Sequence, residues 1–304
     1  MEIVLLGTSA ALPTLRRRPT ATAVVRGNEV LLFDCGEGTQ IQYQKAQLRP
    51  GKLTRIFVSH FHGDHFYGLI GFLTSLQLLG RKPPLYLYGP KGLREYLQFM
   101  QRLGAFQFGF QVVVHEVPES CAEETWDLGA YTVTARPLKH RLFSLGYRLE
   151  EKPKPGKFNA GRAQRLRIPE GAVRRQLLRG ERVRLPDGRE IRPEQVVGPA
   201  RPGKRIAICF DTRPCENAVR LAQDVDLLIH DGTFDENRSD LAQKTGHSTV
   251  VEAAKIAKRA GARKLVLGHI SQRYKEKDEP ELLAQAKRVF PNTVLGRDLL
   301  RMAV

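Results

Sequence analysis

The 304-residue chain alternates short runs rich in Val, Ile and Leu with segments of helical periodicity. Runs of this kind, bounded by glycine, proline or polar residues, predict β-strands. The strands predicted in the first half of the chain cover residues 2–6, 22–26, 30–34, 54–58, 84–88, 111–115 and 130–135. The uncharged stretch 66–80 predicts a buried helix, and residues 92–103 predict an amphipathic helix. The pattern indicates an α/β fold in which a meander of strands precedes the first long helix.

Three hydrophobic runs, the last of those above and two later in the chain, each lead to a side chain that can bind a metal. These pairs are residues 131–139 with His140, residues 205–210 with Asp211, and residues 264–268 with His269. Because functional groups at the carboxyl ends of strands meet at one edge of a sheet, we expect the three side chains to lie together. A single histidine is more often a structural residue. Recurrence at three strand ends favours a shared site.

The segment Ser59 to His65 places three imidazoles and one carboxylate close together in the sequence, at His60, His62, Asp64 and His65. This set suits a borderline-soft cation such as Zn²⁺ and exceeds the needs of one tetrahedral site, which indicates two metals. The segment lies on a predicted strand-to-helix turn. Alternation points His60 and His62 the same way, whereas Asp64 and His65 begin the helix and face a second ion. A surface cluster of solvated histidines is the alternative.

Charge adds a second feature. The chain has 49 lysines and arginines against 32 aspartates and glutamates, so its net charge is +17 and its pI is near 10.0. Such an excess favours a polyanionic partner, with nucleic acid ahead of an anionic membrane. A generally arginine-rich proteome is the alternative explanation.

Much of this excess lies between residues 151 and 205, where 16 lysines and arginines face 6 acidic residues and 14 of 55 residues are glycine or proline. The segment predicts a flexible basic arm that binds a phosphate backbone. Within it, residues 173–178 predict a short helix, and residues 183–191 predict a hairpin with an Asp-Gly turn. A disordered, solvated linker is the alternative.

The four cysteines, Cys35, Cys121, Cys209 and Cys215, form no Cys-x-x-Cys pair, which argues against a disulfide framework or a zinc knuckle. A reducing cytoplasm is therefore expected. The N-terminus predicts a first strand and not a leader. The longest uncharged run is shorter than the roughly 20 residues of a membrane span. We expect a soluble, cytoplasmic protein without a membrane partner.

The chain resembles the metallo-β-lactamase superfamily and, within it, the short form of the ribonuclease Z family. The resemblance rests on residues 60–65, His140, Asp211, His269, residues 210–214 and residues 246–249. It implies an α/β fold, the four-layer αββα sandwich. Residues 1–304 would form one domain, into which residues 151–204 insert a flexible tRNA-binding arm.

The resemblance also implies two Zn²⁺ ions per subunit. One zinc would bind His60, His62, His140 and Asp211, and the other Asp64, His65, His269 and the bridging Asp211. Two cations about 3.5–4 Å apart can share a hydroxide of near-neutral pKa and neutralise charge on a phosphodiester under attack. Asp64 would serve both as a ligand and as the base that orients the attacking water.

By the same resemblance His247 gives a proton to the leaving oxygen, and Asp231 orients it. The family sequence His-Glu-Ala-Thr is replaced here by residues 230–233, His-Asp-Gly-Thr. Gly232 lacks a side chain, so the backbone can move inward and compensate for the shorter acid. The alternative for His247 is a residue that merely precedes a capped helix, with Glu252 completing the cap. We expect His230 to support a ligand and His115 to be structural.

The implied function is removal of the 3′ trailer from precursor tRNA by cleavage after the discriminator nucleotide, in a homodimer. A small-molecule phosphodiesterase of the same fold, a β-CASP nuclease and a non-catalytic RNA-binding protein are the alternatives, although 304 residues leave little room for the extra β-CASP domain. In the loop 7–18, Pro13 and Arg17 match the family pattern but Leu15 and Arg18 do not. Discrimination against a 3′ CCA end is therefore left open.

Overall fold

The computed structural model describes residues 1–304 and divides into two compact units. The larger, which we call the body, comprises Met1–Trp126, Val133–Leu149 and Arg205–Val304. The smaller, which we call the inserted unit, comprises Asp127–Thr132 and Glu150–Lys204. All the predicted metal ligands belong to the body.

The first sheet of the body has the strand order β18-β1-β3-β4-β5-β6-β7. Its strands are β1 (Glu2–Gly7), β3 (Ala21–Arg26), β4 (Glu29–Phe33), β5 (Leu53–Phe57), β6 (Leu85–Pro90), β7 (Val112–Val117) and β18 (Arg301–Ala303). The pairs β1–β3 and β3–β4 are antiparallel, whereas β4, β5, β6 and β7 run parallel. The predicted meander of strands is confirmed, with ends shifted by one or two residues.

The second sheet has the order β17-β15-β14-β13-β10-β9-β8. Its strands are β8 (Glu124–Asp127), β9 (Tyr131–Leu138), β10 (Ser144–Glu151), β13 (Arg205–Cys209), β14 (Leu227–Asp231), β15 (Leu265–Gly268) and β17 (Thr293–Leu295). Strands β13, β14, β15 and β17 are parallel. A short parallel pair, β2 (Ser9–Ala10) with β16 (Ile270–Ser271), lies outside both sheets.

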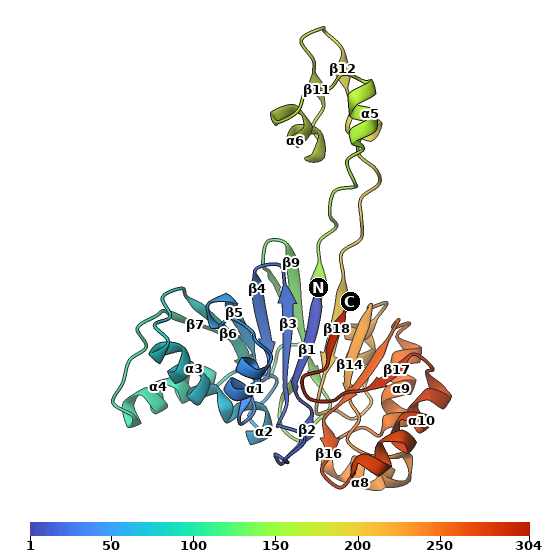
Figure 1. Ribbon diagram of the computed structural model, residues 1–304. Coiled ribbons are helices and arrows are strands. Elements are labelled where there is room, and N and C mark those ends of the chain that lie inside the picture. Colours follow the sequence, from blue (N-terminus) through green and yellow to red (C-terminus); the bar gives the residue numbers. More distant parts are fainter. The chain divides into compact units, whose positions relative to one another are not determined.

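Helices cover the outer face of each sheet, as Figure 1 shows. On the first sheet these are α1 (Thr39–Lys45), α3 (Gly68–Leu78) and α4 (Leu93–Leu103); on the second, α7 (Glu216–Ala222), α9 (Val250–Arg259) and α10 (Glu279–Val289). Aromatic rings pack between the sheets: Phe57 stacks on Phe33 at 4.8 Å and meets Tyr147 of the second sheet at 5.4 Å. The expected four-layer αββα sandwich is confirmed.

The buried helix predicted at residues 66–80 is present as α3. A short helix, α2 (Gly63–Phe66), precedes α3, so Asp64 and His65 lie in a first helical turn as expected. Each of α3, α4 and α10 has 11 residues. None of the helices is long and apolar enough to cross a bilayer.

The inserted unit has a small hydrophobic core of its own. Its elements are α5 (Ala160–Arg165), α6 (Ala172–Leu178), β11 (Val183–Arg184) and β12 (Glu190–Ile191). Val183 pairs with Ile191 across the predicted hairpin, and Gly188 has the positive φ of +84° that its turn requires. Leu177 and Ile191 are almost fully buried in the core. A buried core argues against a disordered linker, while the flexibility of this unit stays a prediction.

Candidate metal centre

All seven predicted metal ligands converge in the body, at one end of both sheets. His60 and His62 lie in the loop after β5, and Asp64 and His65 lie in α2. From the second sheet, His140 follows β9, Asp211 follows β13, and His269 lies between β15 and β16. Their donor atoms form two groups, which meet at Asp211.

The first group surrounds one oxygen of Asp211. The Oδ2 atom lies 3.4 Å from His60 Nε2, 3.9 Å from His62 Nδ1 and 3.7 Å from His140 Nε2. The ring nitrogens are themselves close, with 2.9 Å between His60 Nε2 and His62 Nδ1. Three imidazoles and one carboxylate within 4.8 Å of one another supply the number and kinds of donor that a tetrahedral zinc site uses.

The second group surrounds the other oxygen of Asp211. The Oδ1 atom lies 2.9 Å from His65 Nε2 and 3.0 Å from His269 Nε2. Asp64 Oδ2 lies 3.6 Å from the first of these nitrogens and 3.1 Å from the second. Asp211 therefore has one carboxylate oxygen in each group.

The donor set fits a cation. Asp211 Oδ1 is buried and accepts no hydrogen bond, although two ring nitrogens lie within 3.0 Å of it. Acceptor atoms that face one another at such distances repel unless a positive charge lies among them. Imidazole and carboxylate together suit zinc and related divalent ions.

Backbone strain marks three residues at the centre. Asp34, Asp211 and His269 have φ values of +59°, +47° and +55°. Residues other than glycine seldom adopt the left-handed region, and they do so chiefly where the surrounding structure enforces it. This backbone conformation sets the direction in which the Asp211 and His269 side chains leave the chain after their strands end.

The outer nitrogens of four imidazoles are held by other protein groups. His65 Nδ1 donates to Asp34 Oδ2 at 2.7 Å, and His140 Nδ1 donates to the Gly246 carbonyl at 2.8 Å. His60 Nδ1 lies 2.9 Å from Ser59 Oγ, and His269 Nδ1 lies 2.9 Å from Thr233 Oγ1. Such contacts fix ring orientation in metal sites.

Sequence reasoning did not find Asp34 or Thr233 as site residues. Asp34 also accepts the Ser59 N–H at 2.7 Å, so it orders the start of the metal motif. The available signal was its position: a carboxylate at the end of a hydrophobic strand run, like Asp211. Thr233 donates to Asp231 Oδ1 at 2.5 Å and so joins His269 to the predicted proton-donor pair.

Electrostatics separate the histidines. Burial lowers the pKa of His60 to about 4 and also lowers the pKa of His140, so both rings are neutral and offer lone pairs. Burial acts the same way on His65, but Asp211, Asp34 and Asp64 outweigh it and raise its pKa well above the ordinary value. The three carboxylates around the His65 ring therefore make this position favourable for a positive charge.

The predicted proton donor lies beside this cluster. His247 Nδ1 is 3.1 Å from Asp231 Oδ2 and 3.9 Å from Asp211 Oδ2. Burial disfavours the charged ring, but the Asp231 carboxylate outweighs it and raises the pKa of His247 to about 9. The ring is therefore protonated at neutral pH and can give up a proton.

The alternative expectation for His247 coexists with this arrangement. Thr249 and Glu252 do form a capping box at the start of α9. Arg213 donates to the His247 carbonyl at 2.6 Å and also pairs with Glu252. The helix cap thereby positions the histidine; the role of Arg213 was not foreseen.

Two other histidines lie outside the donor groups. His230 is fully buried in β14 and donates through Nδ1 to the Asp231 carbonyl at 2.8 Å. His115 stacks on Tyr88 at 4.7 Å in the first sheet. Their positions agree with supporting and structural roles respectively.

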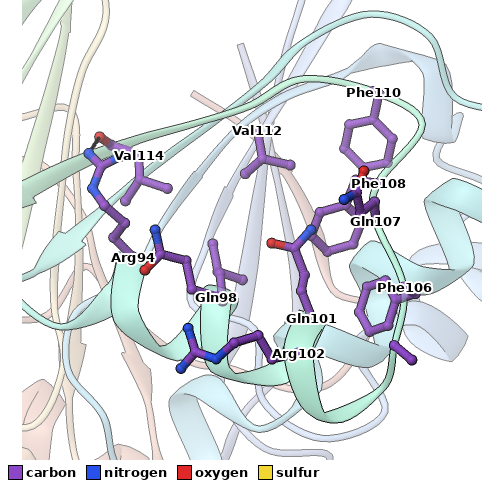
Figure 2. A pocket seen from close by; sticks show the side chains of 12 residues that line it. Arg94, Gln98, Gln101, Arg102, Phe106, Gln107, Phe108, Phe110, Val112 and Val114 are labelled. Carbon is purple, nitrogen blue, oxygen red and sulfur yellow. Dashed lines mark hydrogen bonds between the residues drawn. The ribbon is translucent and has the colours of Figure 1, made fainter.

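A cavity of about 440 Å³ opens onto the metal cluster; its lining includes His62, Asp64, Asp211, His247 and His269. A larger cavity of about 850 Å³ lies between α4 and the segment that follows it (Figure 2). Its lining includes Gln98, Gln101, Phe106 and Phe108 but no histidine, acid or nucleophile. The chemistry therefore belongs to the smaller cavity.

The fold and the histidine–aspartate cluster define a metallo-β-lactamase-fold protein with side chains that can hold metal ions. Residues 15–144 match the Metallo-beta-lactamase superfamily, and residues 180–270 match the Beta-lactamase superfamily domain. Ribonuclease Z of Methanosarcina acetivorans is 42% identical over 100% of this chain and 98% of its own. Ribonuclease BN of Cronobacter sakazakii is 42% identical over 100% of both chains.

A solved structure agrees with these relatives. The crystal structure of human tRNase Z, short form, matches with a TM-score of 0.73 at 29% identity, over 100% of this chain and 99% of the human one. The chain belongs to the ribonuclease Z family. The expected enzyme class, a hydrolytic endoribonuclease, is thereby confirmed.

Proposed function

We propose that this enzyme removes the 3′ trailer from precursor tRNA by hydrolysing the phosphodiester after the discriminator nucleotide. The observation that carries the proposal is the pair of donor groups that share Asp211, in a chain 42% identical to a ribonuclease Z over its full length. A small-molecule phosphodiesterase of this fold has no use for the basic inserted unit.

The cofactor we propose is a pair of Zn²⁺ ions. His60, His62, His140 and Asp211 would hold one ion, and Asp64, His65, His269 and Asp211 the other. Bound there, the ions supply an acidified water and positive charge against the phosphate.

The residues of the chain carry out the proton transfers. Asp64, fixed by the Ala11 N–H at 2.7 Å from its Oδ2 atom, orients the attacking water and takes its proton. His247 gives a proton to the leaving oxygen of the tRNA, and Asp231 keeps that ring charged and in place. Base and acid are thus separate groups in one cavity.

The inserted unit is the part we propose to bind tRNA away from the cut. Exposed arginines support this: Arg162 and Arg165 line a surface hollow on it together with Leu166 and Gln195. Guanidinium groups pair well with phosphate oxygens, and every such contact releases counterions from the RNA. The small hydrophobic core of the inserted unit gives these arginines a folded support.

We further propose a cytoplasmic homodimer. Leu78 and Leu79 at the end of α3, and Phe99 and Leu103 of α4, are more than half exposed. Exposed apolar side chains of this size favour burial against a second copy of the chain. The free cysteines suit a reducing compartment.

The proposal is tested with purified enzyme and a matched pair of precursor tRNAs, with and without an encoded CCA sequence. Mapping both product ends should show a single cut after the discriminator in the CCA-less substrate, leaving a 3′ hydroxyl on the tRNA and a 5′ phosphate on the trailer. The comparison also settles CCA discrimination. A cut elsewhere, or none, would refute the proposal.

A further inference from the structure

The cavity at the metal cluster has an exposed aromatic wall. Tyr67 lines it, and 68% of this residue is exposed. One edge of the ring nevertheless has a contact with the main chain. A Cβ atom on Gly63 would lie 2.5 Å from Tyr67 Cε2, so the ring packs directly against the backbone between two predicted metal ligands. The chain thus holds an apolar surface beside the reacting centre and leaves it uncovered by its own side chains.

A cation lines the same cavity. Arg141 directly follows His140 and is exposed. A Cβ atom on Gly246 would lie 3.5 Å from Arg141 Cγ, so the aliphatic stem lies against the residue that precedes His247. The Arg141 side chain therefore belongs to the segment that holds the predicted ligand His140 and packs against the segment that holds the predicted proton donor His247.

We propose that Tyr67 and Arg141 form a nucleotide-binding subsite next to the cut. Tyr67 stacks on an unpaired base that flanks the scissile phosphate, and Arg141 binds a phosphate that flanks it. Aromatic rings bind unpaired RNA bases in this way, and guanidinium groups bind phosphates in bidentate fashion. The inference rests on the proposed function because it assumes an RNA substrate.

The subsite also explains why the ring is left exposed. An exposed Tyr67 contributes little to the stability of the body, but a base that stacks on it adds to substrate affinity. Gly63 has its own part, because any side chain there would displace the ring. Tyr67 and Arg141 position the substrate and take no part in proton transfer.

The test compares KM and kcat for precursor tRNA in Tyr67→Ala, Tyr67→Phe and Arg141→Ala. Ile41→Ala removes a different exposed apolar side chain, and Arg102→Ala removes an exposed arginine of the larger cavity, so both serve as matched controls. Melting temperature and zinc content show whether each variant is folded and loaded.

Tyr67→Ala should raise KM about tenfold or more, whereas Tyr67→Phe, which keeps the ring, should stay within about twofold of wild type. Arg141→Ala should raise KM and reduce the slope of log KM against log salt by about 0.7. The controls should keep the wild-type KM. The subsite is refuted if Tyr67→Ala keeps the wild-type KM or if Tyr67→Phe loses as much as Tyr67→Ala.

A spectroscopic readout identifies the stacked base. 2-Aminopurine is placed at the discriminator or at the first trailer nucleotide and bound to the slow variant His247→Ala. The proposal is supported if the fluorescence is quenched at one of the two nucleotides and if the quenching is lost in the double variant that combines His247→Ala with Tyr67→Ala. Absence of quenching at both nucleotides overturns it. Each of these overturning outcomes leaves cleavage of precursor tRNA by the wild-type enzyme unaffected. Failure of the subsite is therefore distinguishable from failure of the proposed function.

Discussion

His247 Nδ1 and Asp231 Oδ2 lie 3.1 Å apart, although Asp231 belongs to a strand and His247 lies in the loop before α9. Asp231 ends β14 and accepts backbone N–H groups from Thr212, Thr233 and Ser248 at 3.3, 2.9 and 3.2 Å. A carboxylate held by this many donors cannot swing away. Asp231 is one carbon shorter than the glutamate of the family sequence, but it still reaches the His247 ring.

Replacing His247 by alanine should leave both proposed metals bound and slow the reaction. The ring lies outside the seven predicted ligands, and a positioned general acid contributes typically about 10²–10⁴-fold to a rate. The measurement is kcat for precursor tRNA together with zinc content by mass spectrometry. Unchanged kcat would remove His247 as the proton donor, and lost zinc would make it a ligand.

The pH dependence tests the same pair. Asp231 raises the pKa of His247 from 6.5 to about 9, so the charged donor form persists through neutral pH and is lost as pH rises through its pKa. Metal ions bound nearby would lower the pKa of His247 below this value. The alkaline fall of kcat should therefore lie at a pH between 6.5 and about 9. Asp231→Asn should move that limb to lower pH. An alkaline limb that does not move would contradict the pairing.

Removing Asp211 should abolish metal binding and activity together. Its two oxygens serve both donor groups, at 2.9–3.0 Å from two nitrogens on one side and 3.4 Å from the nearest nitrogen on the other. Loss of an outer-shell partner alone costs about 10–100-fold, so loss of the shared ligand should exceed a hundredfold. Asp211→Ala is compared with Asp240→Ala, an exposed aspartate of α8 (Ser239–Thr245). Retention of two zinc ions by Asp211→Ala would contradict this arrangement.

The sequence predicted the convergence of the site because its signals are local. A strand run followed by His140, Asp211 or His269 is visible without knowledge of the fold, and the parallel strands β13 and β15 do end at one edge. Thr233 and Arg213 act through partners far away in the chain, and their residue types alone carry no such signal. Asp34 ends a strand run as Asp211 does, but the sequence does not show that its partner is the His65 ring.

Strand β10 was missed for a physical reason. Its sequence contains Gly146, which weakens a strand pattern. In the structure a Cβ atom there would lie 2.7 Å from Leu221 and 3.0 Å from Leu138, so the glycine is required by close packing. Strand β9, predicted at residues 130–135, continues through Pro137 to Leu138.

Close packing also predicts the effects of two glycine substitutions in α3. A Cβ atom on Gly68 would lie 2.0 Å from the Gly36 carbonyl oxygen, so Gly68→Ala must displace backbone and should destabilise the body by about 1–3 kcal/mol. Gly71→Ala meets only the end of the Gln40 side chain, at 3.4 Å, and should stabilise by about 0.5–1 kcal/mol. Urea denaturation of both variants measures the difference; equal midpoints would contradict the packing.

The role of the inserted unit is tested by replacing residues 153–202 with a short Gly-Ser linker, which spares all of β10. The metal cluster and both large hydrophobic cores belong to the body. Hydrolysis of a small chromogenic phosphodiester should therefore stay within about threefold of wild type. Cleavage of precursor tRNA should fall by at least about tenfold, because the deletion removes a large share of the phosphate-binding cations.

A charge variant separates the cations from the fold of this unit. Arg162→Glu combined with Arg165→Glu alters exposed side chains and leaves the core around Leu177 intact. It should weaken tRNA cleavage and flatten its salt dependence, whereas Arg259→Ala, an exposed arginine of α9 in the body, should change neither. Full tRNA cleavage by both the deletion and the double variant would show that the unit has no part in substrate binding. Loss in the deletion alone would mean that other residues of the unit make the contact.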